Sequence, residues 1–109
     1  MSGVKPAAVG MPVDNPFAAL MDDAMNIMQE GMSRAPMNGS ADHDFAAMMI
    51  PHHQGAVDMA KAELLYGKDP VLRRLAQEII VSQGQEIAVM QRQIDAMSTR
   101  PPFTSSKAP

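Results

Sequence analysis

Histidine and methionine side chains cluster in the stretch of residues 42–60. All three histidines of the chain fall there: His43, His52 and His53. Met48 precedes His52 by four residues, and Met59 follows His52 by seven. On an α-helix these spacings place Met48, His52 and Met59 on one face. Imidazole nitrogen and thioether sulfur together suit a soft metal ion such as Cu(I). The spacing therefore predicts a mixed nitrogen and sulfur metal site on this helix.

A second methionine and histidine pair lies next to the first in the sequence. Met49 lies four residues before His53, and on an ideal helix His53 points about 100° away from its neighbour His52. Pro51 precedes both histidines. A proline inside a helix removes one ladder hydrogen bond and clashes with the preceding turn, so we expect a kink or a bulge there. The two histidines then serve two sites, or a single site if the distortion turns them together.

Four methionines form a stripe earlier in the chain. They are separated by four, three and four residues: Met21, Met25, Met28 and Met32. Flexible methionine side chains fill spaces between helices, and thioethers also bind Cu(I) and Ag(I). Methionine supplies 12 of the 109 residues, which favours a metal role. Core packing and metal binding require the same helical spacing, so both interpretations stay open.

Several nearby residues also have two interpretations. His43 is either a surface or hydrogen-bonded histidine or a further ligand. Asp44 and Asp58 are a first-turn carboxylate and a solvated residue, or else hydrogen-bond partners that orient a histidine. Gln83 lies at the wet margin of a helix seam or supports a buried polar site. Gly55 allows close approach by a packed helix or by a metal ligand.

Composition and missing motifs argue against several classes of function. A net charge of -3 with nine scattered basic residues favours neither DNA nor RNA binding. Without cysteine there is no thiolate site and no disulfide. The chain lacks the Glu-x-x-His pairs of di-iron bundles, the His-Glu-x-x-His of zinc hydrolases, a phosphate-binding loop and a carboxylate cluster for hard metals. We therefore expect a binding protein and not an enzyme. No apolar run is long enough for membrane insertion.

Three helices are expected to position these residues. Capping residues and prolines give the ranges 15–34 with Asn15 as N-cap, about 40–66 ended by Gly67, and 69–99 opened by Asp69 and Pro70. The short link at 67–69 makes the last two helices an antiparallel hairpin. Residues 1–14 and 100–109 are expected to be flexible tails. The chain is thus predicted to be one all-α, three-helix domain over residues 15–99.

The third helix carries a seam of core-facing positions. Its members recur at alternating spacings of four and three: Ala76, Ile80, Gln83, Ile87, Met90, Ile94 and Met97. The seam predicts the side of this helix that packs against the rest of the domain.

The histidine stretch resembles the signature of the DUF305 family. The matching residues are Phe45, Met48-Met49-Ile50-Pro51-His52-His53-Gln54-Gly55-Ala56 and Asp58-Met59-Ala60, followed by Ser82-Gln83, Glu86-Ile87 and Met90. The resemblance covers roughly residues 15–99. It implies a ferritin-like helical bundle, often exported to the periplasm or cell surface. Members similar to the copper-binding protein CopM bind copper and silver and support metal tolerance.

The resemblance also suggests roles for particular residues. His52 and His53 match the paired histidines of the family, and the flanking methionines match Met48, Met49 and Met59. The stripe at 21–32 resembles the methionine-rich first helix. Some relatives carry two copies of the hairpin and this chain carries one. It is therefore expected either to act as a monomer or to be completed to four or more helices by oligomerisation.

From these features we expect a metallochaperone or sequestering protein that captures Cu(I), and Ag(I) through the same softness, in copper tolerance. The stripe at 21–32 is expected to face Met48, His52 and Met59 across a helix interface. Cu(II) is expected to use the three histidines, since imidazole suits it better than thioether.

The expected partners are a copper transporter or another copper protein, or a second copy of the chain. The resemblance places it in the periplasm or outside the cell, although residues 1–16 lack the features of a signal peptide. Two alternatives stay open. One is a methionine-rich module that binds another protein without metal, and the other is a copper-dependent redox enzyme.

Overall fold

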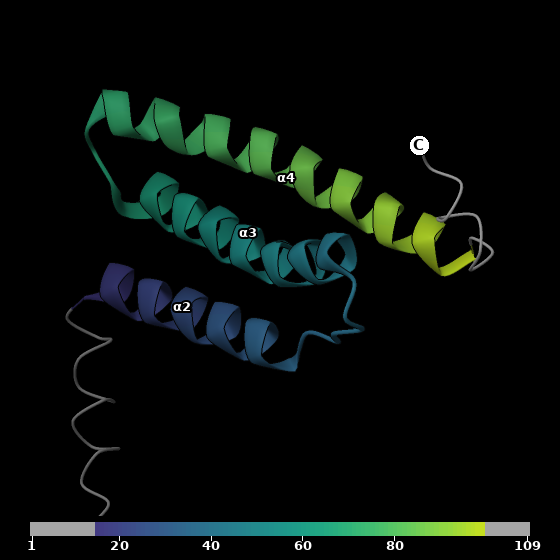
Figure 1. Ribbon diagram of the computed structural model, residues 1–109. Coiled ribbons are helices and arrows are strands. Elements are labelled where there is room, and N and C mark those ends of the chain that lie inside the picture. The colour runs from purple at the N-terminus through teal and green to yellow at the C-terminus, as the bar shows by residue number, and fades with distance from the viewer. Residues whose placement is uncertain (1–14, 100–109) are drawn as a thin grey trace, which may run out of the picture.

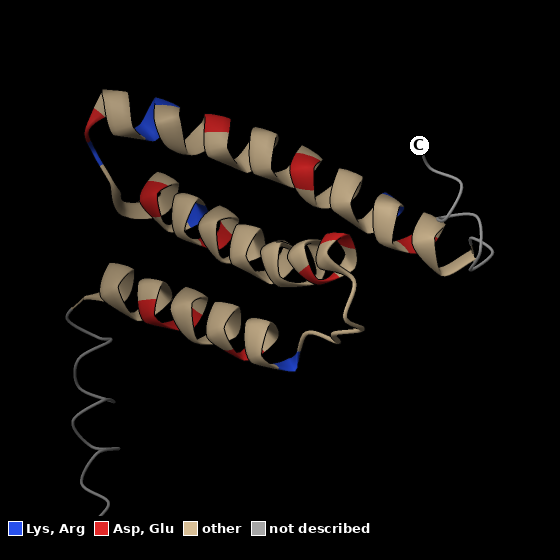
Figure 2. Cartoon of the chain, in the orientation of Figure 1, with Lys and Arg blue, Asp and Glu red and all other residues tan. Residues whose placement is uncertain are grey.

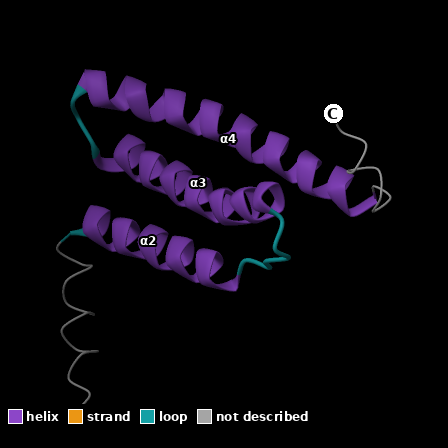
Figure 3. Ribbon diagram, in the orientation of Figure 1, coloured by secondary structure: helices purple, strands orange, loops and turns teal. Residues whose placement is uncertain are grey.

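The chain folds into three α-helices joined by short loops. The computed structural model describes residues 15–99, in which the helices are α2 (Pro16–Arg34), α3 (Ala41–Tyr66) and α4 (Pro70–Thr99) (Figures 1 and 3). Within this range there is no β-strand. The predicted all-α fold with three helices is confirmed. The two expected tails lie outside the described residues.

Each helix begins at a polar residue whose side chain accepts a backbone hydrogen bond from the first turn. The oxygen-to-nitrogen pairs are Asn15 with Ala18 at 3.0 Å, Ser40 with His43 at 3.4 Å, and Asp69 with Leu72 at 2.9 Å. These bonds satisfy N–H groups that have no partner inside the helix. Proline follows two of the caps, at Pro16 and Pro70, where its missing N–H costs nothing. The helix starts predicted from capping residues are confirmed.

Two local expectations need correction or refinement. A kink or a bulge is expected at Pro51; the helical residues of α3 continue through it without a break or a π-turn, so the bulge is absent. Gly67 does end α3 as predicted, and its N–H bonds to the carbonyl of Glu63. Its φ of -72° is not left-handed, however. An added Cβ would instead overlap the Glu63 carboxylate, so a larger residue here would require the flexible Glu63 side chain to move.

The three helices form a layer with α3 in the middle (Figure 1). α3 packs against α2 on one side and against α4 on the other. No Cα atom of α2 lies within 8 Å of a Cα atom of α4 in the described chain. The α3–α4 pair is the antiparallel hairpin that the short link predicts. Both broad faces of the layer therefore stay open over much of their area.

Small residues bring the helices close together. A Cβ atom built on Gly31 would lie 2.7 Å from the Cβ of Pro51. One built on Gly55 would lie 2.8 Å from the Cβ of Met28. The buried apolar side chains are correspondingly short: Ala24, Ala46, Ala47, Val57, Ala60, Ala62 and Ala76. Larger apolar side chains are left at the flanks of each interface and on the open faces.

The predicted seam of α4 packs against α3. All seven of its positions are buried or half-buried, whereas most other α4 residues are exposed. Charged residues of both signs are spread along the three helices (Figure 2). None of the described helices combines the length and apolar character that crossing a bilayer would need.

Candidate metal centre

Three predicted ligands lie on one open face of α3. The side of α3 that holds Pro51, Gly55 and Ala62 packs against α2, and the side that holds His53 faces α4. Helical rotation of 100° per residue places Met48, His52 and Met59 between these two sides. His52 is exposed, and both methionines are half-buried. The imidazole is thus open to solvent between two thioethers.

The methionine stripe of α2 lies on the same face of the layer. On the opposite face, Leu20 and Ile27 of α2 line a cleft with Lys61 of α3. Lys61 is nine residues from His52, which is half a rotation around the helix. The stripe occupies the other flank of α2, so it must lie on the side of His52. Its members there are Met21, Met25, Met28 and Met32.

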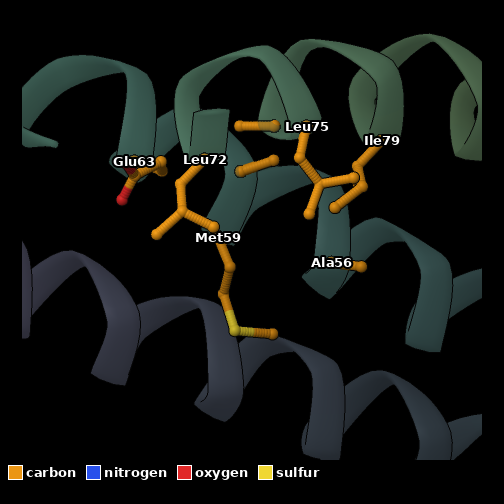
Figure 4. Close-up of a pocket in the computed structure, with 8 residues that line it drawn as sticks. Ala56, Met59, Glu63, Leu72, Leu75 and Ile79 are labelled. Carbon is orange, nitrogen blue, oxygen red and sulfur yellow. The ribbon is translucent and has the colours of Figure 1, made fainter. Parts of the chain in front are cut away.

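Contacts across the interface agree with this placement. Met28 lies directly over Gly55, because a Cβ built on that glycine would meet three atoms of the Met28 side chain. Met25 is 46% exposed, whereas the other three members of the stripe are half-buried. In Figure 4 the thioether of Met59 extends from α3 toward α2, away from Leu72 and Leu75. The structure therefore brings thioethers of two helices to the face that carries His52.

His53 occupies a different environment, between α3 and α4. Its side chain is only 13% exposed, and its Nε2 lies 2.7 Å from Oε1 of Glu86 on α4. A carboxylate accepts hydrogen bonds and does not donate them, so Nε2 must carry the proton. In the neutral ring the lone pair then resides on Nδ1. Within residues 15–99 that atom is buried without a hydrogen-bond partner, as is Oε1 of Gln83.

Sequence reasoning did not assign Glu86 as the partner of a histidine. In the sequence it stands out only as one of the residues that match the family signature. Glu86 lies three residues after Gln83, on the flank of the α4 seam. That periodicity gives a weak signal that Glu86 faces α3. Only the register between α3 and α4 identifies His53 as its partner.

The two adjacent histidines are close enough to consider a shared ion. Their ring centroids are 6.2 Å apart and their planes are tilted by 58°. With metal–nitrogen bonds of about 2 Å, two imidazoles on one ion have centroids no more than about 6 Å apart. The observed distance is at this limit, which requires a nearly linear arrangement. Separate sites for His52 and His53 fit the geometry better.

His43 lies away from the other histidines. Its side chain is 15% exposed, and its Nδ1 lies 2.9 Å from Oδ1 of Asp44. His43 precedes His52 by nine residues, which is half a rotation and about 13 Å along the helix. The structure does not bring the three histidines together. Across the described chain, no group of three or more His, Cys, Asp or Glu residues could hold a metal ion.

Asp44 has both of the roles considered for it. Besides contacting His43, its carboxylate accepts hydrogen bonds from the backbone N–H groups of Asn38 and Gly39 at 2.9 and 3.1 Å. The hydrogen bond with His43, and then the bond from Asn38, lower the pKa of Asp44 below 3.8. Gly39 adopts a φ of 91°, which favours glycine. Asp44 thus ties the α2–α3 loop to the start of α3.

Neither Asp58 nor Gln83 forms a hydrogen bond to a histidine in the described part of the chain. Asp58 accepts a hydrogen bond from Gln54 at 3.1 Å, one turn earlier on α3, and no bond from it to a histidine occurs within residues 15–99. Gln83 is half-buried on the α4 seam, with its unpaired oxygen one turn from Glu86. This position fits a residue that supports a buried polar site better than one at the solvent-exposed edge of the helix seam.

Comparison with known proteins places the chain in a family. The profile of the Domain of unknown function (DUF305) matches residues 5–94. A 54-residue segment is 41% identical to the uncharacterized protein L153 of Acanthamoeba polyphaga mimivirus. That segment covers 50% of this chain and 36% of the viral protein. Since the profile covers most of the 109 residues, the chain belongs to the DUF305 family.

Proposed function

We propose that this protein binds Cu(I) on the open face formed by α2 and α3, with Ag(I) as a surrogate. The proposal rests mainly on one observation, that the methionine stripe of α2 lies on the same face as Met48, His52 and Met59. Thioether sulfur and neutral imidazole are soft or borderline donors that Cu(I) accepts in flexible geometries. The lack of a carboxylate cluster in the described chain disfavours Ca²⁺ and Mg²⁺.

These side chains are accessible to an ion from solvent. Met25 is 46% exposed and His52 is exposed, while the helix interfaces themselves are filled by alanine and glycine. Thioethers near the surface can take up and release an ion without opening the fold. The biological role proposed is therefore copper delivery or sequestration in the periplasm or outside the cell, without catalysis.

Competition for copper tests this proposal. The open-face variant combines Met48→Leu, His52→Ala and Met59→Leu, which largely preserves volume while removing the donor atoms. Its control combines Met37→Leu and Met97→Leu, two methionines away from the site. Each protein is titrated anaerobically with Cu(I) against a colorimetric chelator. The wild type and the control are expected to win the same defined amount of copper, and the open-face variant at least one ion fewer per chain.

Two outcomes would contradict the proposal in different ways. An unchanged stoichiometry and affinity in the open-face variant would remove Met48, His52 and Met59 from the ligand set. Failure of the wild type to take any copper from the chelator would assign the methionines to packing. Circular dichroism of the three proteins separates loss of the site from loss of the fold.

A second candidate function is supported by the apolar character of the same face. Phe45 precedes His52 by seven residues and is 63% exposed, and Leu72 and Leu75 of α4 are 52% and 48% exposed beside Met59. Adaptable methionine-rich surfaces of this kind bind apolar helices of other proteins. Assembly with a partner that is unaffected by a copper chelator would favour this function. A copper requirement would favour the first.

A further inference from the structure

We propose that Glu86 is a positioning residue for a second copper site between α3 and α4, where Nδ1 of His53 and the thioethers of Met49 and Met90 are the donors. This inference rests on the copper-binding function proposed above. It concerns a different interface, because the open-face site joins α2 to α3. The chemical class of ligand is again a single soft ion, Cu(I) or Ag(I).

The first step is the orientation of the imidazole. The distance of 2.7 Å between Nε2 of His53 and Oε1 of Glu86 is typical of a strong hydrogen bond to a carboxylate. Holding the proton on Nε2 selects one tautomer and leaves Nδ1 as the nitrogen with a free lone pair. Carboxylates that bind the second nitrogen of a metal-bound histidine act in this way in known metal proteins.

The second step is the state of the free nitrogen. Nδ1 of His53 and Oε1 of Gln83 are buried and unpaired within residues 15–99. Both are acceptors, so neither can satisfy the other. Burying an unpaired acceptor is unfavourable, and a cation at Nδ1 removes that cost. The neighbourhood therefore favours uptake of a positive ion.

The third step supplies the sulfur donors. Met49 lies one turn before His53 and Met90 lies one turn after Glu86, and both are half-buried. Because α3 and α4 run antiparallel and His53 faces Glu86, the two methionines lie at the same level of the interface. Side chains on a helix lean toward its N-terminus, so the ring of His53 leans toward the turn that holds Met49. The register thus places one nitrogen donor and two sulfur donors at neighbouring turns of the same interface, from two helices.

The orienting role of Glu86 is tested first without metal. Long-range ¹⁵N–¹H NMR spectra at mildly alkaline pH report which nitrogen of His53 carries the proton. The wild type is expected to show a single tautomer with the proton on Nε2. Glu86→Gln should preserve it, because the amide oxygen still accepts the bond, and Glu86→Ala should give a mixture. Glu78→Ala is the control, since Glu78 is exposed on the same helix and forms no side-chain hydrogen bond in the described chain. A mixture of tautomers in the wild type, or no change in Glu86→Ala, would overturn the positioning role.

The metal site is tested with Cu(I) alone, in anaerobic competition against the chelator. Met49→Leu with Met90→Leu is expected to lose one ion per chain while the open-face site keeps its own. Glu86→Ala is expected to weaken binding at the second site by about 10- to 100-fold, with Glu86→Gln much closer to wild type. If the wild type binds copper but the Met49 and Met90 changes do not alter its stoichiometry, this inference fails and the proposed function stands. If the wild type binds no copper, the proposed function fails, while the tautomer result still decides whether Glu86 positions His53.

Discussion

Replacing Gly31 with alanine should destabilise the protein by separating α2 from α3. The new Cβ would lie 2.7 Å from the Cβ of Pro51, whereas two carbon atoms in good contact are about 3.5–4.0 Å apart. The Pro51 ring is rigid and belongs to the middle helix of the layer, so the helices must move apart by about 1 Å. Overpacking of this kind costs about 1–3 kcal/mol. It is partly offset because alanine is more favourable than glycine inside a helix by about 0.5–1 kcal/mol.

Gly84→Ala is the matched control for this strain. Gly84 lies inside α4, and a Cβ built on it meets no atom within 4 Å. Its replacement should therefore show only the gain of about 0.5–1 kcal/mol from helix propensity. The difference in free energy of unfolding between the two variants isolates the packing term of about 1–3 kcal/mol. Urea unfolding followed by circular dichroism measures it. Equal stability of Gly31→Ala and Gly84→Ala would show that the α2–α3 contact is not close in solution.

Two further predictions concern the hydrogen bonds that start the helices. Hydrogen bonds lower the pKa of Asp44 in the folded protein. Its carboxylate therefore stabilises the fold at pH values above the unfolded pKa of about 3.9. This contribution is lost as the pH falls through the lower pKa of the folded state. Urea unfolding across this pH range should show Asp44→Asn less stable than wild type near neutrality, and the difference in free energy of unfolding should shrink in acid. A difference that does not depend on pH would contradict the lowered pKa of Asp44. Asn15→Ala removes the cap of α2 and should cost about 1 kcal/mol, measured by the same unfolding curve, while no loss of stability would mean that the cap does not form.

The close α2–α3 contact also bears on the proposed copper site. Met28 packs over Gly55, so the distance between the two helices sets how near the thioethers of α2 come to Met48, His52 and Met59. Gly31→Ala should therefore weaken copper binding at the open face even though it alters no ligand. The second site, between α3 and α4, should be unaffected. This contrast follows from the layered arrangement, in which α3 forms two independent interfaces.

Local sequence determined where the helices begin and end. Asn15, Ser40 and Asp69 supply side-chain oxygens at helix starts, and these interactions involve residues only three positions apart. The face shared by Met48, His52 and Met59 is likewise a property of one helix and follows from 3.6 residues per turn. Such features were predictable because they need no knowledge of other helices. The exception is Pro51, where a kink or a bulge is predicted and the bulge does not form, since α3 continues there without interruption.

Tertiary structure decided which faces meet. The pairing of His53 with Glu86 joins residues 33 positions apart, and helical periodicity alone cannot set the register between two helices. The same is true of Gly31 against Pro51, which draws α2 onto α3 and leaves α4 on the far side. Spacing along a helix therefore identified the candidate donor atoms, but the packing of separate helices determined their neighbours, because those contacts depend on the shapes of surfaces distant in the chain.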